Sequence, residues 1–370
     1  MLDSKREKIA LCIILIISLA IGIPQYLNAV EAKKPNHSSD GWSTLTPELA
    51  GMNEDLLIDA CRFLKKTDAT CFMVIRHGQI VVEKYYRGQR PTDFSFAYSI
   101  TNSYLSALIG IAVDMGIIKS IDNSVAQYFP EYFDIETNPQ MESITIKHLL
   151  TMTSGISSVP EELFHTTDWV QNFLRLPFDS QPGSSFKYDA GITHLLSGII
   201  TKASGIKAAD FSRKHLLEPL GVSGIIWHAG PKGYNIGGEF LYMKPQDIAK
   251  FGVLYANEGV WNGIQVISNE WIFESLSPQI DLLSVESDAP FKACTGFGYN
   301  FMLCDEGDFP YYFAEGKGTV PNLCIIPELD MVVVVTSYHS MFKKEFTYEK
   351  FQTLLKEYVF ASVIDSSGGQ

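Results

Sequence analysis

The pattern of hydrophobic and polar positions predicts strands toward both ends of the chain and helices between them. Residues 71–88 form two strand-like runs around a His-Gly pair, which favours a hairpin turn. Helical spacing is clearest at 143–156 and 191–206. Three later runs are strand-like and a last one is helical, namely 296–304, 311–316, 323–339 and 348–363. We therefore expect one sheet completed by both ends of the chain, with a helical section at about 119–235 beside it.

The helix predicted at 98–118 is apolar along most of its length but begins with polar residues. Its apolar positions have the three-to-four spacing of a buried helix, at Leu105, Leu108, Ile109, Ala112 and Val113. Ser99, Asn102 and Ser106 share one stripe, because residues three and four apart stack on the same side of a helix. A serine in this place is typical of an N-cap, whose hydroxyl accepts a backbone N–H. Ser99 is therefore either a cap or a hydroxyl kept for chemistry.

Two further stretches place reactive side chains beside turns. In 181–205 a Pro-Gly turn leads to Tyr188, and a helix starts near Gly191. In 311–330 glycines surround Lys317 and interrupt a late strand, which is typical of a bulge or of a close approach to the backbone. Considered alone, a tyrosine just before a helix usually packs against the core. Glycines within a strand, considered alone, usually mark an ordinary β-bulge.

In this order the three stretches resemble the serine β-lactamase-related hydrolases, which include penicillin-binding proteins, class C β-lactamases and related esterases and oligoamide hydrolases. The resemblance extends over about residues 45–360 and is strongest to the branch with 6-aminohexanoate-oligomer hydrolases. Further segments similar to the family are HLLTMTSGI, HLLSGIITKASG, LLEPLGV, YNIGG, IAKFGVLYANEGVWNG and CIIPELDMVVVVTS. The resemblance implies an α+β fold of the β-lactamase/transpeptidase type, with an antiparallel sheet flanked by helices plus an all-helical subdomain.

The resemblance also implies roles for individual residues. Ser99 occupies the nucleophile position of the family motif S-x-x-K, and Asn102 occupies its lysine position. Tyr188 and Ala190 occupy the second motif, Y-x-N or Y-x-S, whose tyrosine acts as acid and base. The third motif falls within residues 314–319 in a register that stays open, and its substrate-binding candidates are Gly316, Lys317 and Gly318. The implied reaction is hydrolysis of a small-molecule or peptide-like ester or amide through a Ser99 acyl-enzyme, without metal or cofactor.

Asn102 departs from the family pattern at the position that activates the nucleophile. A lysine one turn after the serine can remove its proton when burial lowers the lysine pKa, whereas an amide cannot hold a proton at neutral pH. Ala190 lacks the polar side chain of the second motif, and Pro321 removes a backbone donor beside the third. Two lysines near the motifs could replace the missing motif lysine, and Lys317 is the better candidate. Lys187 directly precedes Tyr188, and adjacent residues of an extended segment point to opposite sides. We expect a serine hydrolase, with a non-catalytic binding or scaffolding member of the same fold as the alternative.

Other catalytic patterns do not account for the sequence. It contains no G-x-S-x-G nucleophile elbow and no H-E-x-x-H zinc motif. His148 and His194 lie inside helical apolar runs, so we expect them in the core or at its edge. Residues 204–207 match S-x-x-K by letter, but their surroundings match an ordinary helix start of the family.

Composition and charge narrow the range of partners. Of the 370 residues, 46% are hydrophobic and 19% are charged, which is ordinary for a globular protein. The net charge of -13 and the scattered basic residues argue against a nucleic-acid partner.

The N-terminus carries a targeting signal. Three basic residues precede the uncharged apolar run 9–23, which has the length of a signal-peptide core and is short for a bilayer span. Small residues at Ala29 and Ala32 permit cleavage, whereas extension of the run through Leu27 gives a membrane anchor. We therefore expect an extracytoplasmic protein, secreted or held at the membrane by this segment. The expected organisation is a signal peptide or anchor at 1–33, a linker at 34–48, the β-lactamase-related domain at 49–362 and a flexible tail at 363–370.

The cysteines allow at most a partial disulfide framework. Cys12 lies in the targeting segment, and the other five are Cys61, Cys71, Cys294, Cys304 and Cys324. An odd number cannot all pair, and no CxxC spacing indicates zinc. We expect mostly buried thiols, with Cys304 and Cys324 as the candidate disulfide.

Overall fold

The computed structural model describes residues 42–133, 139–284, 294–305, 309–314, 322–337 and 346–364. They all lie within the unit Ser39–Gln370. The apolar run 9–23, expected to direct export or to anchor the chain, lies outside the described residues, as does most of the tail. Within the described part, no helix combines the length and the apolar character needed to cross a bilayer.

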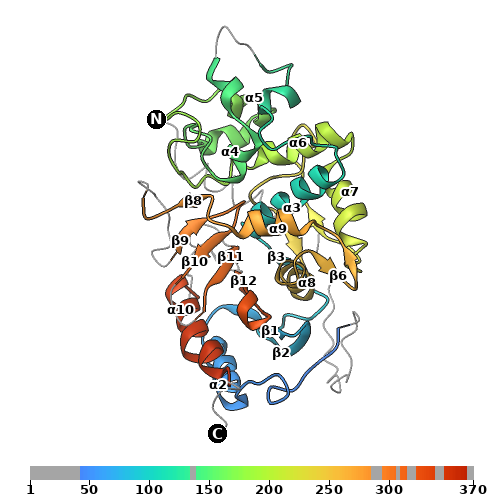
Figure 1. Ribbon diagram of the computed structural model, residues 1–370, viewed down its shortest axis with the longest axis vertical. Coiled ribbons are helices and arrows are strands. Elements are labelled where there is room, and N and C mark those ends of the chain that lie inside the picture. The colour runs from blue at the N-terminus through green and yellow to red at the C-terminus, as the bar shows by residue number, and fades with distance from the viewer. Residues whose placement is uncertain are drawn as a thin grey trace, which may run out of the picture. The chain divides into compact units, whose positions relative to one another are not determined.

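An antiparallel sheet forms the framework of the described residues (Figure 1). Its strand order is β2-β1-β13-β12-β11-β10-β9-β8. The strands are β1 (Ala69–Arg76), β2 (Gln79–Tyr85), β8 (Ile280–Asp281), β9 (Cys294–Phe297), β10 (Met302–Cys304), β11 (Tyr311–Ala314), β12 (Asn322–Ile326) and β13 (Met331–Ser337). β1 pairs with β13 along its length, from Arg76 opposite Met331 to Ala69 opposite Ser337. The prediction that both ends of the chain complete one sheet is confirmed, and so is the hairpin of β1 and β2.

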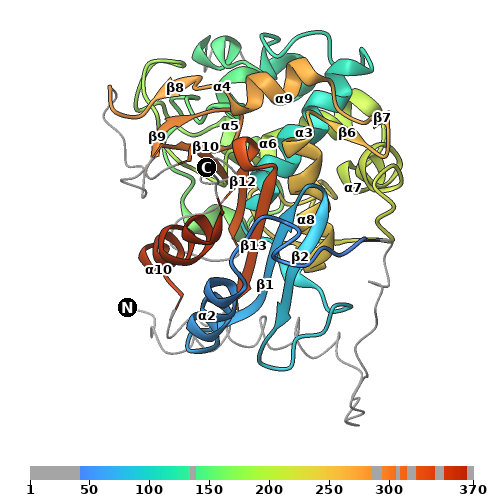
Figure 2. The same ribbon diagram turned by 60° about the horizontal axis from the view of Figure 1, so that its bottom comes forward.

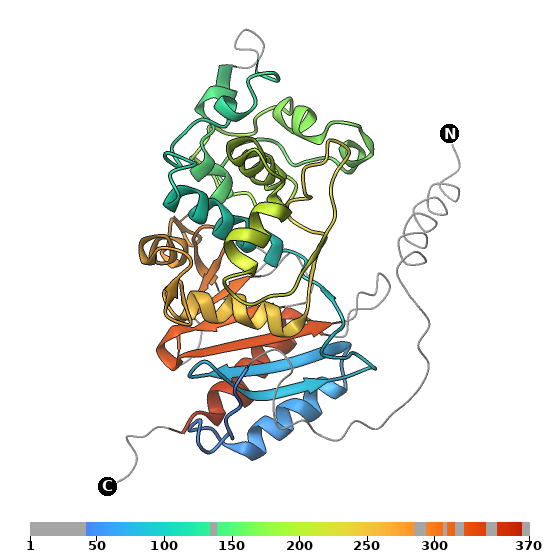
Figure 3. The same ribbon diagram turned by 90° about the vertical axis from the view of Figure 1, so that its right-hand side faces the viewer.

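Helices cover both faces of this sheet. The α-helices of the described part of the chain, not all of which lie on the sheet, are α2 (Glu54–Lys65), α3 (Ile100–Asp114), α4 (Ile146–Leu150), α5 (Trp169–Leu174), α6 (His194–Ser204), α7 (Ala208–Ser212), α8 (Pro245–Ala256), α9 (Asn269–Leu276) and α10 (Tyr348–Thr353). Met73 and Ile75 of β1 point into the hydrophobic core shared with α3 and α8. Phe72 and Val74 point the other way, into the core shared with α2 and α10. Figures 2 and 3 show α8 on one face of β1 and β13 and α2 on the other, so the α+β fold is confirmed.

Close packing of α8 on the sheet depends on one glycine. A Cβ added at Gly252 would lie 2.7 Å from side-chain atoms of Leu323 and Val332 on β12 and β13. The missing side chain therefore lets the helix backbone approach the strands.

The helical section lies between α3 and the strand β4 (Ile226–Trp227). Its helices α4 to α7 fall within 119–235, and α6 and α7 pack against α3. Figure 3 shows this green to yellow section stacked beyond α8 from the sheet. The exact domain boundaries expected from the sequence stay predictions.

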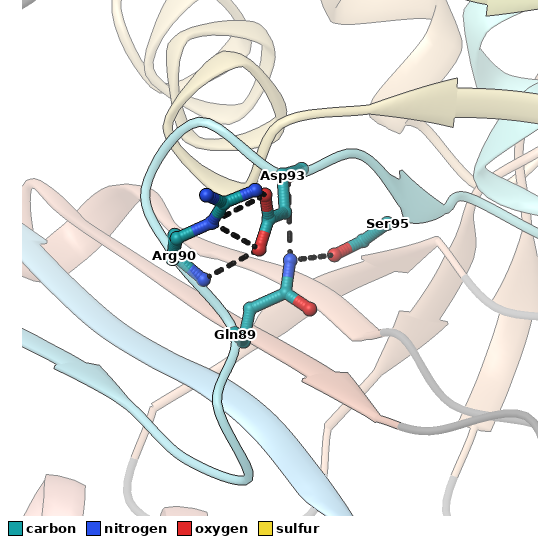
Figure 4. Close-up of polar contacts among 4 residues, drawn as sticks. All are labelled: Gln89, Arg90, Asp93 and Ser95. Carbon is teal, nitrogen blue, oxygen red and sulfur yellow. Dashed lines mark hydrogen bonds and ion pairs between the residues drawn. The ribbon is translucent and has the colours of Figure 1, made fainter. Parts of the chain in front are cut away.

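A small sheet leads the chain into α3. β3 (Ser95–Phe96) pairs with β5 (Leu241–Met243), which also pairs with β4. A separate hairpin joins β6 (Val260–Trp261) to β7 (Ile264–Gln265). The loop before β3 is tied by Asp93, whose carboxylate accepts hydrogen bonds from the Arg90 side chain and backbone (Figure 4). The Gln89 amide donates to the Asp93 carbonyl and to Ser95 Oγ, so the segment that ends at Ser99 has a defined path.

Two runs predicted as single strands are hairpins in the structure. The run 296–304 contains the turn between β9 and β10, and 323–339 contains the turn between β12 and β13. Asn300 and Asp330 adopt left-handed backbone conformations there, with φ of 61° and 46°. Asn and Asp tolerate this region better than other residues, which allows the chain to reverse inside an apolar run.

The candidate disulfide between Cys304 and Cys324 is wrong. Cys304 is instead bonded to Cys294, its direct partner in the pairing of β9 with β10. Cys324 lies on β12, which β11 separates from β10, and it is a buried free thiol. Cys61 and Cys71 are also free, as expected for most of the cysteines.

Candidate active site

Ser99 lies at the N-terminus of α3 but does not cap it. Its own backbone is already helical, with φ -76° and ψ -2°, and its side chain makes no capping hydrogen bond. Tyr98 before it has φ 44°, a left-handed conformation that is rare for a bulky residue. The Thr101 hydroxyl donates to the Tyr98 carbonyl and holds this turn. The capping interpretation of Ser99 therefore does not describe the structure, and its hydroxyl is not used by the helix.

Asn102 connects Ser99 to Tyr188. Its backbone N–H donates to the Ser99 carbonyl over 2.9 Å, and its side-chain Nδ2 donates to the Tyr188 hydroxyl over 3.0 Å. The three residues that the sequence places in the first and second motifs thus lie together. Asn102 is 2% exposed, so its amide needs partners inside the protein.

Thr193 supplies the second partner of this amide. Its hydroxyl, in a fully buried residue, lies 2.7 Å from Asn102 Oδ1 and 2.6 Å from the Ala190 carbonyl. The Thr193 donor fixes the oxygen end of the amide, so the nitrogen end faces Tyr188. Sequence reasoning missed Thr193, because a threonine within a helical apolar run carries no signal of its own.

This arrangement orients Tyr188 without supplying a base. The Asn102 amide donates an N–H to the Tyr188 oxygen, but it cannot take up the proton of the tyrosine. Asn102 therefore holds the Tyr188 hydroxyl one turn from Ser99 and contributes no proton acceptor.

Two glycines bring a distant loop against Ala190. A Cβ added at Gly238 would lie 2.2 Å from the Ala190 carbonyl oxygen, and one at Gly237 would lie 2.5 Å from the His194 backbone. Gly238 also has φ 85°, which other residues rarely adopt. The YNIGG segment, similar to the family in sequence, thus packs directly on the loop of the second motif.

His194 holds the same loop in place. Its ring is 2% exposed, and Nδ1 accepts the backbone N–H of Gly237 over 3.2 Å. Burial lowers the pKa of His194 to about 4, so the ring is neutral and can accept this bond. The expectation that His194 is a core residue is confirmed, and His148 lies half-buried at the edge, where it accepts the Thr145 N–H in a capping box.

Asp189 fixes the backbone on either side of the second motif. Its carboxylate accepts the N–H groups of Gly191 and Val159, both over 2.8 Å. Burial raises the pKa of this carboxyl, and the backbone hydrogen bonds oppose the rise. Asp189 therefore joins the turn after Tyr188 to a neighbouring loop.

Lys187 does not serve the site. Its Nζ forms an ion pair with Asp179 over 2.5 Å, and both side chains are partly exposed. The hydrogen bonds from Lys187 and Ser157 lower the pKa of Asp179. The prediction that Lys187 points away from Tyr188 agrees with this pairing.

The third motif lies largely outside the described residues. Ala314, the last residue of β11, is buried, and α3 contacts this strand. Gly316, Lys317, Gly318 and Pro321 are not described, so their assignment stays a prediction. Among the residues that are described, no cluster of His, Cys, Asp and Glu could hold a metal ion.

Comparison with known proteins agrees with this fold. The 6-aminohexanoate-dimer hydrolase of Paenarthrobacter ureafaciens is 20% identical over 74% of this chain and 74% of its own length. Solved structures that share the fold include a family VIII carboxylesterase, with 16% identity, a TM-score of 0.66 and 83% and 97% of the two chains covered. An octameric penicillin-binding protein homologue from Pyrococcus abyssi is 20% identical, with a TM-score of 0.64 and coverage of 83% and 77%.

Coverage of the relatives is uneven. The matched region spans 40% and 32% of the length of two other curated relatives.

The sequence model described as Beta-lactamase matches residues 62–349, which is well over half of the chain. The resemblance noted from the three motifs is thereby confirmed, and the chain belongs to the beta-lactamase family, whose members are serine hydrolases.

Proposed function

We propose that this protein is a serine hydrolase that cleaves an ester or amide through a Ser99 acyl-enzyme. The observation that carries the proposal is the turn into α3, where Ser99 makes no capping bond and Tyr98 is left-handed. Such a conformation costs on the order of 1–3 kcal/mol, is held by the surrounding structure and is enriched at active sites. A serine that served only as a cap would need neither feature.

The reaction follows from the groups at the site. Ser99 Oγ forms a bond to the substrate carbonyl carbon, and its proton passes by way of Tyr188 to the leaving alcohol or amine. The Ser99 N–H and an N–H of the third-motif strand stabilise the oxyanion. Water then cleaves the acyl-enzyme, which releases the acid and returns the proton to Ser99.

Asn102 sets the expected rate. Loss of a positioned base typically costs on the order of a hundred- to ten-thousand-fold, while binding groups and the oxyanion site still contribute. We therefore propose slow turnover rather than none, unless Lys317 acts as the substitute base.

A second candidate function is binding without catalysis. The specific observation in its favour is that both ends of the Asn102 amide are engaged, by Tyr188 and by Thr193. A side chain held at both ends in this way would suit a fixed ligand pocket in a non-catalytic binding or scaffolding member of the family.

We also propose that the folded unit is extracytoplasmic, secreted or held at the membrane by the N-terminal segment. The Cys294–Cys304 disulfide supports this proposal, since such bonds persist in oxidising compartments.

Intact mass after incubation with a fluorophosphonate tests the hydrolase proposal. A single adduct on the wild type that is lost in Ser99→Ala is expected. Ser106→Ala, which removes a hydroxyl two turns along the same helix, should label normally. Folded wild-type protein that acquires no adduct would favour the non-catalytic function.

A further inference from the structure

A groove with a volume of about 910 Å³ lies between the helix α2 and the strand β2. β2 is an edge strand of the large sheet. Figure 3 shows α2 next to the two blue strands, β1 and β2, on the side away from α8. The residues that line the groove lie on α2 and β2, in Pro47 and in the two residues that follow β2.

Apolar side chains line the middle of the groove. Leu57 of α2 is buried, and Val82 of β2 is half-buried and packs against the same core. Ile58 of α2 also lines the groove and is exposed. The Tyr86 hydroxyl donates to the Cys61 carbonyl over 3.1 Å, which ties the end of the strand to the helix. The groove therefore offers an apolar surface between two elements that are held together.

The outer edge of β2 already pairs with one extended segment of the chain. Thr44 lies opposite Ile80 in a parallel bridge. The Ile80 N–H donates to the Ser43 carbonyl over 3.0 Å, and the Leu45 N–H donates to the Ile80 carbonyl over 2.9 Å. The chain then leaves the edge in a turn that begins at Pro47. This edge is thus able to accept a strand, and the chain itself uses only its first part.

The rest of this edge lies along the groove. The Tyr86 N–H donates to the Thr70 carbonyl of β1 over 2.9 Å, so the backbone of Tyr86 faces the sheet. Because backbone groups alternate in direction along a strand, Glu83 and Tyr85 direct theirs to the outer edge. Within the described residues, β2 pairs beyond Ile80 with β1 alone. Such a row of N–H and C=O groups can take up a further strand.

Two lysines place positive charge in the groove. Lys65 is the last residue of α2, and Lys84 lies near the end of β2. Both are exposed, and neither takes part in the ion pairs of the described residues. Arg62, which also lines the groove, is paired with Asp59. The two lysines therefore carry the charge that a partner can use.

The carboxylates that line the groove do not neutralise these lysines. Glu83 turns toward α8, where it accepts hydrogen bonds from the Gln246 amide over 2.7 Å and the Tyr85 hydroxyl over 2.6 Å. Glu54 is the first residue of α2, at the opposite end of the helix from Lys65. In a chain with a net charge of -13, this is a place where an acidic partner finds attraction rather than repulsion.

We propose that the groove between α2 and β2 binds an extended acidic peptide segment of another protein, which adds to β2 as a strand. The outer backbone groups of β2 pair with the peptide, its apolar side chains contact Leu57 and Val82, and its acidic end meets the two lysines. A lipid anion would use the lysines and the apolar lining but would leave the strand edge unpaired. Ser99 takes no part, so the inference does not depend on the proposed hydrolase function.

Fluorescence anisotropy with labelled peptides tests the charge preference on the full-length chain. The peptide alternates threonine and valine and carries two aspartates at one end, and its control carries two lysines instead. The charged pair is placed at either end, because a strand can add in either direction. We expect one acidic peptide to bind about tenfold more tightly than its lysine control. Lys65→Gln combined with Lys84→Gln should remove most of this difference, whereas Lys207→Gln, just before α7, should leave it unchanged.

Methylated peptides test the pairing with the strand edge. The acidic peptide is methylated on alternate backbone nitrogens, in each of the two possible phases. Only alternate N–H groups of an added strand face its neighbour, so one methylated peptide should bind like the parent and the other at least about tenfold more weakly. Bound peptide should also slow the alkylation of Cys61, a free thiol that lines the groove, as measured by peptide mass mapping.

The inference would be overturned if no peptide bound, or if the acidic peptides and their lysine controls bound equally. Equal binding of the two methylated peptides would also contradict it, because the strand edge would then not be used. Protection of Cys61 by dodecanoate but by no peptide would show that the groove takes a lipid anion instead.

Discussion

Replacement of Thr193 by valine tests whether the Asn102 amide is held by this hydroxyl. Valine has nearly the shape of threonine, so the change removes one hydroxyl without opening a cavity. The residue is fully buried, and the lost donor faces Asn102 Oδ1 at 2.7 Å. Water cannot replace the donor easily, because Asn102 is itself only 2% exposed.

The expected cost follows from this burial. A buried acceptor that loses its partner destabilises a protein by about 1–3 kcal/mol, whereas exposed substitutions usually stay within about 0.5 kcal/mol. We expect Thr193→Val to lower the free energy of unfolding by about 2 kcal/mol, the middle of that range. Thr193→Ser keeps the hydroxyl and loses one methyl, which should cost about 1 kcal/mol.

A double-mutant cycle separates the hydrogen bond from packing. Urea unfolding is measured for wild type, Thr193→Val, Asn102→Ala and the double variant. Because Asn102→Ala removes the acceptor, the two changes should couple by about 1–2 kcal/mol. The cycle built with Thr193→Ser should show almost no coupling energy, since the hydroxyl remains.

Additive effects in the valine cycle would refute the reasoning. So would a Thr193→Val protein as stable as the wild type, because the amide would then have other partners. Either result would remove the argument that Thr193 orients Asn102 toward Tyr188.

Three further outcomes follow from neighbouring contacts. Gly238→Ala should destabilise more than Gly233→Ala in urea unfolding, because the two glycines have φ of 85° and 84° but only the first meets Ala190; equal effects would mean that the contact is relaxed at no cost. The pKa of His194 is lowered to about 4 from 6.5, so its contribution to stability is full above pH 6.5 and is lost as the pH falls toward 4. This loss amounts to about 3 kcal/mol, and His194→Gln should remove it from the pH dependence of unfolding; an unchanged dependence would contradict the buried neutral ring. Lys187→Met should leave the rate of fluorophosphonate labelling unchanged, since the lysine pairs away from the site, and a large loss would show that it reaches Ser99.

Much of the architecture could be predicted because it depends on local pattern. Two strand-like runs around a His-Gly pair identified β1 and β2, and helical spacing identified α3 and α6. The disulfide could not be predicted, because it depends on the register of β9 against β10. That register depends in turn on a left-handed Asn300 inside an apolar run.

The candidate site was predicted in part. Motif order brought Ser99, Asn102 and Tyr188 together, and the structure joins them by hydrogen bonds. Thr193 was missed, because it acts through a contact made only in three dimensions. A single threonine in a sequence says nothing about the amide beside it.

The central claim is that Ser99 occupies a hydrolase site whose base position is filled by an orienting amide. The most direct test is kcat/KM for p-nitrophenyl acetate in Asn102→Lys compared with the wild type. We predict a gain of at least about a hundredfold, the typical contribution of a positioned base, and its complete loss when Ser99→Ala is added. A folded Asn102→Lys protein with no gain, or a gain that survives Ser99→Ala, would contradict this claim.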